Sequence, residues 1–546
     1  MSGIADRFTE LPVHEALPPL RRALEDNTRA VLAAPPGAGK TTLVPLDILE
    51  AEWCDGKIIL IEPRRLAARA AARRMAAMLS EQAGETVGYR MRLDNRISKK
   101  TRIEVVTEGV FTRMALDDPE LSGISCVIFD EFHERALEAD FGLALALDIQ
   151  SGLREELRLL VMSATLDVER VAGLLETDAV VESAGRAYPV EIRHADRPGG
   201  ERIEETMVRT IRRLHAEEDG SILAFLPGQG EILRTAEMLG RSLGDATSVF
   251  PLYGGLSGEE QDRAIRPAAQ GERKVVLATP VAESSITIDG VRIVVDSGLV
   301  RQPVLEPDTG ITRLETVRAS RASADQRAGR AGRTAPGIAV RLWHQGQTAA
   351  LPAFAAPQVL ASDLSGLVLD CAAWGVGDPR ELKFIDSPPE AAVTEARKLL
   401  VSLDALDDTG HITERGHVMR ALPLPPRLAA MVAEARETGD AFVAAAISVL
   451  LTEQGLGGNS PDLDDRLTRF LRDNSPRARA ARSLAARMAG GKERGNAQGE
   501  TAAAHLAVAF PDRIARQRGG RGRFVMANGR GCEIDETQRL AGADYI

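Results

Sequence analysis

The stretch from Ala34 to Thr42 (APPGAGKTT) has the residue types of a phosphate-binding loop. It follows a short apolar segment predicted to be a strand and precedes a helical pattern. Backbone N–H groups of such a loop can surround phosphates, and the helix start adds its positive dipole end. Lys40 should reach the β- and γ-phosphates, and the Thr41 hydroxyl should hold Mg²⁺. The remaining nucleotide contacts expected from this loop are Gly37, Ala38, Gly39 and Thr42.

This loop departs from the usual pattern at its first residue, where Ala34 replaces Gly. Alanine is unsuitable there only if the backbone needs a positive φ. The alternative interpretation is an ordinary turn between a strand and a helix.

A second group of polar residues ends the apolar segment Cys126 to His133 (CVIFDEFH). The carboxyl end of a parallel strand lies at the sheet edge that also carries a phosphate loop. Asp130 should therefore hold Mg²⁺ through water, and Glu131, beside the metal, should orient and deprotonate the attacking water. A strand end facing solvent is the alternative, but the phosphate loop upstream favours a catalytic site.

The third group is Gln326 to Arg333 (QRAGRAGR). Arginines recur every three residues, so Arg330 and Arg333 can share one helix face. A solvated basic helix start is the alternative, although the glycines would weaken such a helix. The pattern predicts arginine fingers, supplied by a second domain, that stabilise charge on a transferring phosphoryl group.

Two series of alternating strands and helices should position these groups. The expected strands of the first are residues 29–34, 57–62, 102–107, 125–130 and 158–163. Those of the second are 221–226, 248–253, 274–279, 291–296 and 337–343. Such alternation predicts two parallel sheets covered by helices. The segment from about 180 to 200 contains Pro and Gly and is expected to be a connection.

Beyond residue 345 the pattern becomes mixed and then helical, and after residue 510 it becomes rich in Gly and Arg. The expected domains are residues 1–180, 181–345, 346–415, 416–510 and 511–546. A chain of 546 residues is too long for one core, so several domains are expected.

The composition indicates a soluble globular protein, with 44% hydrophobic and 27% charged residues and a net charge of −11. The net charge argues against general polyanion binding but allows a local basic channel. The four cysteines lie far apart and have no CxxC spacing, which disfavours zinc and suits a reducing compartment, so we expect a cytoplasmic protein. The longest apolar run, 441–451, is too short to span a bilayer.

These motifs, in this order, resemble those of the superfamily 2 helicases of the DEAH/DExH type. The resemblance covers residues 15–345 and also includes Pro63-Arg-Arg65, Thr107-Glu-Gly109, Ser163-Ala-Thr165, Phe225 to Glu231 and Thr279 to Asp289. It implies an α/β fold with two tandem RecA-like domains. A winged helix, a helical bundle and the start of an OB-like barrel should follow, as Phe384 to Pro389 and Leu422 to Pro425 also suggest.

The resemblance also assigns roles around the nucleotide. Gln326, Arg330 and Arg333 would face the γ-phosphate, and His133 would link the metal site to the second domain. Ser163 and Thr165 would connect the nucleotide site to the nucleic-acid groove. Residues assigned to the base and the rest of the nucleotide are Arg74, Arg266 and Asp289.

On the nucleic-acid side, the resemblance implies that Arg64, Thr107 and Thr287 contact the RNA backbone. Arg92 would lie in a hook-shaped turn that guides the strand, and residues 299–317 would form a β-hairpin wedge. Two residues depart from the family pattern. Phe132 stands where Ala is usual in the DExH box, and Pro280 replaces an Asn that would make a strand contact.

The favoured hypothesis is a monomeric enzyme that hydrolyses ATP, or any NTP, with Mg²⁺. It would move 3′ to 5′ on single-stranded RNA and act on structured RNA, with no membrane partner. A DNA-acting translocase stays open because phosphate contacts do not distinguish RNA from DNA. A nucleotide-gated RNA-binding scaffold would not need Glu131, and a small-molecule kinase would not need a second domain with arginine fingers.

The final segment suggests that the chain is the front part of a longer protein. Residues 513–530 contain six arginines and no acidic residue. With the glycines and Phe524, they predict an unfinished RNA-binding barrel whose surface follows phosphates and stacks an occasional base. A flexible basic tail is the alternative.

Overall fold

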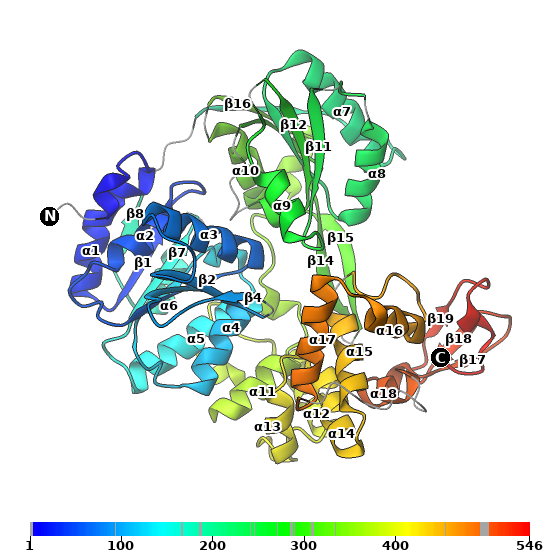
Figure 1. Cartoon of the computed structure of the whole chain (residues 1–546). Helices are drawn as coiled ribbons and strands as arrows, with labels where there is room; N and C mark the ends of the chain where they lie inside the picture. Colours follow the sequence, from blue (N-terminus) through cyan, green and yellow to red (C-terminus); the bar gives the residue numbers. More distant parts are fainter. Residues whose placement is uncertain are drawn as a thin grey trace. The chain divides into compact units, whose positions relative to one another are not determined.

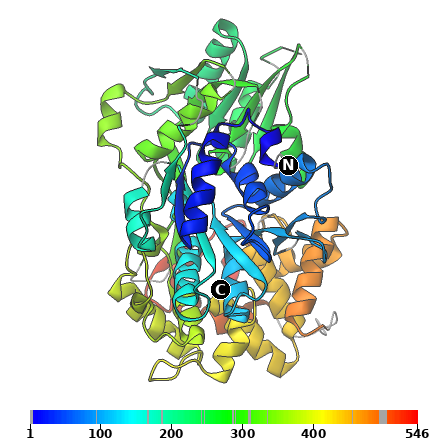
Figure 2. The same ribbon diagram turned by 90° about the vertical axis from the view of Figure 1, so that its left-hand side faces the viewer.

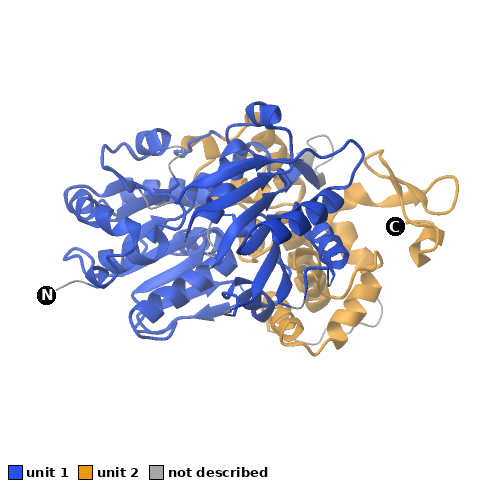
Figure 3. Ribbon diagram, turned by 90° about the horizontal axis from the view of Figure 1, so that it is seen from above, with its two compact units in different colours: residues 1–305, 312–362, 382–387 blue, residues 306–311, 363–381, 388–546 orange. Residues whose placement is uncertain are grey.

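The computed structural model of the chain describes residues 4–92, 94–164, 168–184, 188–240, 242–244, 246–269, 271–283, 288, 290–306, 311–333, 335–453, 455–491 and 502–546. The chain divides into two compact units (Figure 3). The first comprises residues 1–305, 312–362 and 382–387, and the second comprises 306–311, 363–381 and 388–546.

The first domain of unit 1 is built on an eight-stranded sheet of order β4-β3-β5-β2-β6-β7-β1-β8 (Figure 1). Every neighbouring pair is parallel except β3 with β4. The strands are β1 (Arg29–Ala33), β2 (Lys57–Glu62), β3 (Val87–Met91), β4 (Asp94–Arg96), β5 (Ile103–Thr107), β6 (Ile124–Phe129), β7 (Arg158–Ser163) and β8 (Val180–Glu182).

Helices cover this sheet (Figure 1 and Figure 2). They are α1 (Leu17–Asp26), α2 (Lys40–Ile48), α3 (Arg65–Met78), α4 (Glu108–Asp117), α5 (Leu137–Gly152) and α6 (Val168–Leu175). Because helices shield it, the sheet has almost continuous apolar central strands, as in β2 and β7.

The second domain of unit 1 has a six-stranded parallel sheet of order β11-β12-β10-β13-β16-β9. Its strands are β9 (Val190–His194), β10 (Ser221–Phe225), β11 (Thr247–Leu252), β12 (Arg273–Ala278), β13 (Val291–Asp296) and β16 (Gly337–Arg341). Its helices are α7 (Ile203–Glu217), α8 (Gln229–Leu239), α9 (Gly258–Ile265) and α10 (Arg321–Gly329). The predicted hairpin is present as β14 (Leu299–Glu306) and β15 (Ile311–Arg318).

The expected connection at 180–200 was wrong in part, because it contains two strands. Strand β8 adds to the edge of the first sheet beside β1, and β9 adds to the edge of the second beside β16. Both are short edge strands with mostly accessible residues. They therefore lack the apolar run that reveals a central strand.

Unit 2 is mainly helical, as the sequence predicts. Its helices are α11 (Ser365–Trp374), α12 (Glu390–Ser402), α13 (Glu414–Arg420), α14 (Pro426–Thr438), α15 (Ala441–Thr452), α16 (Leu463–Arg472), α17 (Pro476–Met488) and α18 (Ala502–Ala509). Helix α15 is the most apolar, and nine of its twelve residues are buried. Within the described ranges, no helix is both long and apolar enough to cross a bilayer.

The C-terminal segment forms a three-stranded antiparallel sheet rather than a flexible tail. Its strands are β17 (Ala515–Gln517), β18 (Arg523–Met526) and β19 (Gly531–Glu533). Arg516 and Tyr545 form a further antiparallel bridge. The proposed base-stacking role of Phe524 was wrong, because this ring is only 2% exposed and forms part of the core.

Candidate nucleotide and nucleic-acid site

The phosphate loop joins β1, which lies between β7 and β8, to α2. Gly37 and Gly39 have φ values of +86° and +91°, which explains the need for glycine at both positions. Ala34 is not among the described residues with positive φ. Its N–H donates to the carbonyl of Ser163 at 3.0 Å, so the alanine is compatible with the loop.

Lys40 begins α2 and is only 3% exposed. Its Nζ lies 3.1 Å from Oε1 of Glu131 and 3.9 Å from Oδ1 of Asp130. Burial alone would lower the pKa of Lys40, but the two carboxylates outweigh burial and raise it. The loop and the DExH strand end are thus brought together as the sequence predicts.

Asp130 immediately follows β6, and the Thr41 hydroxyl donates to its Oδ2. Burial, despite the opposing charge of Lys40, raises the pKa of Asp130 to about 6. A hydroxyl and a carboxylate in contact offer the oxygen ligands that Mg²⁺ prefers. No group of three or more acidic, His or Cys residues that could hold a metal ion occurs among the described residues.

Glu131 adopts the left-handed backbone conformation, with φ of 50°. It precedes a 3₁₀ turn, Phe132–Glu134, and its N–H donates to Oδ1 of Asp130 at 2.8 Å. Burial would raise the pKa of Glu131, but the charges of Lys40 and His133 outweigh burial and lower it. In this structure Glu131 is therefore a buried carboxylate whose charge is stabilised by Lys40.

His133 lies between the catalytic carboxylate and the segment after β7. Its Nδ1 is 3.5 Å from Oε2 of Glu131 and accepts the N–H of Ala164 at 3.4 Å. The described contacts therefore connect His133 to its own domain.

Phe132, the departure from the usual DExH box, belongs to an aromatic core. The ring is 2% exposed and packs edge to face on Phe129, with ring centres 6.2 Å apart. Phe129 in turn packs edge to face on Phe111 at 5.5 Å. The larger side chain fills space behind the catalytic loop without entering the site.

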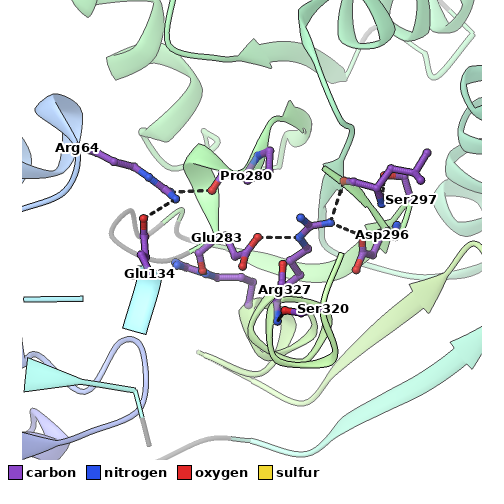
Figure 4. A network of polar contacts seen from close by, with 12 residues as sticks. Arg64, Glu134, Pro280, Glu283, Asp296, Ser297, Ser320 and Arg327 are labelled. Atoms are coloured by element: carbon purple, nitrogen blue, oxygen red, sulfur yellow. Dashed lines mark hydrogen bonds and ion pairs between the residues drawn. The ribbon is translucent and has the colours of Figure 1, made fainter. Parts of the chain in front are cut away.

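The three arginines of the segment 326–333 have different surroundings. Arg327 is fully buried in the second domain, where Nε lies 2.9 Å from Glu283 and NH1 lies 2.8 Å from Asp296 (Figure 4). Helix α10 ends at Gly329 and a 3₁₀ turn starts at Arg330. The turn comprises Arg330–Gly332, and Arg333 follows it directly with helical backbone angles.

Arg333 lies beside the phosphate loop of the first domain, and the charge of Arg330 acts on Glu131. A Cβ atom added to Gly37 would lie 3.2 Å from Nε of Arg333. Arg330 is 3% exposed, and its Nε donates to the Glu283 carbonyl at 2.9 Å. Burial and the charge of Arg333 lower its pKa, while Glu131 opposes them. Nε2 of Gln326 is buried with no hydrogen-bond partner in the described parts of the chain.

Arg64, expected to contact RNA, bridges the two domains of unit 1. Its NH1 donates to the carbonyl of Pro280 at 2.7 Å, and its NH2 lies 3.0 Å from Oε2 of Glu134 (Figure 4). Pro280 stands where the family pattern has Asn. Its carbonyl oxygen accepts this hydrogen bond from Arg64. Thr107 ends β5, and Arg92, after β3, is partly buried.

Some predicted residues are not brought together by any described contact. Arg74 on α3 and Arg266 at the end of α9 are both exposed. The same two helices meet through Arg73 and Asp262, whose NH1 and Oδ2 atoms are 3.3 Å apart. Thr165, Thr287 and Asp289 lie outside the described residues.

Sequence reasoning missed three glutamates near the site: Glu62, Glu108 and Glu134. Glu62 ends β2 and is fully buried, and neither of its carboxylate oxygens has a hydrogen-bond partner among the described residues. Burial, followed by the charges of Asp130 and Glu131, raises its pKa. An acidic residue at the end of an apolar strand, as at Asp130, was the available signal.

Family models match most of the regions described above. The DEAD/DEAH box helicase model matches residues 15–173, and the helicase conserved C-terminal domain model matches residues 204–335. The winged-helix model of the helicase-associated domain HA2 matches residues 396–424.

Curated relatives and solved structures point to the same family as the family models. The chain is 46% identical to "ATP-dependent RNA helicase HrpB" of Escherichia coli over 99% of its own length and 66% of that protein. It is 36% identical to the Schizosaccharomyces pombe pre-mRNA-splicing factor ATP-dependent RNA helicase prp22, over 79% of the chain and 37% of prp22. A crystal structure of E. coli DEAH/RHA helicase HrpB matches with a TM-score of 0.92 and 46% identity, over 98% of the chain and 67% of that structure.

The chain therefore belongs to the DEAD/DEAH box helicase family. Its fold has the tandem RecA-like domains, winged helix and helical segments of that family. The chain nevertheless spans only about two thirds of the length of E. coli HrpB, 66% in the sequence comparison.

Proposed function

We propose that this protein is a nucleic-acid-stimulated NTPase that translocates on single-stranded RNA and unwinds structured RNA. The observation that supports this proposal most directly is the approach of Arg333 to the phosphate loop at Gly37, beside the pair formed by Lys40 and Glu131. A phosphate site completed by a second domain makes hydrolysis depend on domain closure, which is the basis of a motor.

In this proposal Lys40 binds the β- and γ-phosphates, so nucleotide would draw it away from Glu131, 3.1 Å away in this structure. The freed carboxylate then orients and deprotonates the attacking water. Arg330, Arg333 and Gln326 face the γ-phosphate and stabilise its developing charge. Mg²⁺, held by Thr41 and Asp130 with Glu131 nearby, would neutralise phosphate charge.

The nucleic-acid assignment rests on the relatives, which are named as RNA helicases. Arg64, Thr107 and Thr287 would bind the strand backbone and Arg92 would guide it. The hairpin could act as a wedge because Leu314 on β15 is 63% exposed. We further propose 3′-to-5′ movement, a monomeric cytoplasmic protein, and the domain limits given above.

The base site proposed between Arg74 and Arg266 would accept all four NTPs. Two guanidinium planes can stack on any base without reading its edge. Asp289 would complete this part of the nucleotide site. Hydrolysis rates for ATP, GTP, CTP and UTP within about tenfold of one another are expected.

The test is NTP hydrolysis with Mg²⁺ measured without nucleic acid, with single-stranded RNA and with single-stranded DNA. We expect RNA to raise turnover, and Lys40→Ala to abolish turnover in all three conditions without unfolding the protein. Greater stimulation by DNA would favour the DNA translocase. Tight RNA binding with no turnover would favour the nucleotide-gated scaffold.

A further inference from the structure

The guanidinium proposed to bind a strand phosphate already has two partners in this structure. Arg64 contacts Pro280 at 2.7 Å and Glu134 at 3.0 Å. The side chains of Arg64 and Glu134 are 25% and 21% exposed, so this ion pair is partly shielded from water. Figure 4 shows the Arg64 side chain extending from the first domain toward both partners.

Glu134 is joined through the backbone to the water-activating residue. It is the last residue of the turn Phe132–Glu134, and its N–H donates to the carbonyl of Glu131 at 2.9 Å. The left-handed backbone of Glu131, with φ of 50°, starts that turn. A displacement of Glu134 is therefore transmitted through one short turn to the catalytic carboxylate.

The charges of this ion pair also act on a neighbouring carboxyl group. Glu134 and Glu138 both act on Glu108, and Arg64 offsets their charges. Among the described contacts, Glu134 is thus the carboxylate that pairs with Arg64 at the proposed strand-binding edge. A phosphate competes well for such a guanidinium because it also accepts paired, charge-assisted hydrogen bonds.

We infer that Glu134 is a positioning residue that occupies Arg64 until a strand phosphate replaces it. This inference rests on the proposed function, since the competing ligand is the RNA backbone. Release of Glu134 frees the turn that carries Glu131 to move away from Lys40. Glu134 therefore weakens strand binding and makes hydrolysis depend on the strand.

The test variant is Glu134→Gln, which keeps the side-chain shape and removes the charge. The Kd for fluorescein-labelled single-stranded oligouridylate should fall about fivefold, as expected for loss of one competing ion pair worth about 1 kcal/mol. The NTPase rate without RNA should rise, so that the ratio of RNA-stimulated to unstimulated turnover falls. A purely structural role would instead weaken RNA binding and lower both rates.

The matched control is Glu138→Gln, which removes the same charge in the first turn of α5. Glu138 lies near the start of α4, because a Cβ atom added to Gly109 would be 3.9 Å from the Oε2 atom of Glu138. We expect Kd and stimulation to stay within about twofold of the parent. Glu134→Ala is a second test variant, and it should also lower the Kd for RNA. Thermal unfolding confirms that each variant is folded.

Unchanged or weaker RNA binding by both folded Glu134 variants would overturn the inference. If RNA stimulates the parent protein and the variants by the same ratio, the inference fails and the proposed function stands. If RNA does not stimulate the parent protein, the proposed function fails and the inference fails with it.

Discussion

Glu108 is a partly buried carboxyl group at the start of α4, close to the proposed strand-binding edge. Burial raises its pKa from the ordinary value of 4.5 to about 8, and the charges of Glu134 and Glu138 add to this effect. The folded protein thus binds a proton on Glu108 that the unfolded chain has already lost. Stability from this group is present below about pH 4.5 and is lost as pH rises toward 8.

Replacing Glu108 with Gln should therefore stabilise the protein increasingly with pH. The gain at pH 8 is at most about 5 kcal/mol, since each pH unit between 4.5 and about 8 is worth about 1.4 kcal/mol. Urea unfolding at several pH values measures this difference. Glu120→Gln, at an exposed position in the same domain, is the control. A difference between Glu108→Gln and the parent that does not change between pH 5 and 8 would contradict the assignment.

The proximity of individual site residues was predictable where it depends on local sequence motifs. The loop around Lys40 and the strand ending at Asp130 carry their own sequence signals, and the structure brings them together. The raised pKa values of Glu108 and Glu62 were not predictable, because they depend on burial and on neighbours from distant parts of the chain. The burial of Arg327 was not predictable, because Arg327, Arg330 and Arg333 recur every three residues and the sequence does not distinguish the buried one.

Among the elements, the turn after the DExH box is held by an ion-pair network. Arg135 has φ of 50° and is almost completely buried. Its NH2 lies 3.1 Å from Asp140 and 2.8 Å from Asp386, and Asp386 also pairs with Arg170 on α6 at 2.8 Å. Asp386 thereby ties the segments after β6 and β7 to residues 382–387 of the same unit.

Replacing Asp386 with Asn should destabilise the protein by about 1–3 kcal/mol at pH 7, because Arg135 loses one of its charged partners. The arginines lower the pKa of Asp386 despite the opposing effect of burial. Its contribution is therefore present above the unfolded-state pKa of about 3.9 and lost as pH falls below it.

Urea unfolding at pH 7 and near pH 3 tests this ion-pair network. The parent and Asp386→Asn should differ at pH 7 and converge at low pH. The exposed variant Asp408→Asn should match the parent at pH 7. Equal stability of Asp386→Asn and the parent at pH 7 would show that the network does not hold the turn.

The sequence did not reveal strands β3, β4, β8 and β9, of which β4, β8 and β9 lie at sheet edges and β3 lies between β4 and β5. They are short, and β4, β8 and β9 expose many side chains, so apolar periodicity is weak. The central strands of both sheets were predicted because burial on two faces requires continuous apolar residues.

At the scale of the whole molecule, the order of motifs predicted the two α/β domains and the helical region after them. The role of Phe524 was mispredicted because composition cannot tell which face of a three-stranded sheet is buried. The order of the motifs predicted that the proposed phosphate site draws residues from both domains. Its geometry required the structure, which places Arg333 beside Gly37.

The most direct test of a shared nucleotide site compares Arg333→Ala, in the second domain, with Glu131→Gln, in the first. Steady-state ATP hydrolysis with saturating RNA and Mg²⁺ is measured alongside equilibrium ATP binding. We expect each variant to lose about 10³-fold or more in turnover, with ATP affinity within about tenfold of the parent. An Arg333→Ala protein that hydrolyses ATP at the parental rate but binds RNA more weakly, with a reduced salt dependence, would show that Arg333 serves the strand and contradict a site shared between domains.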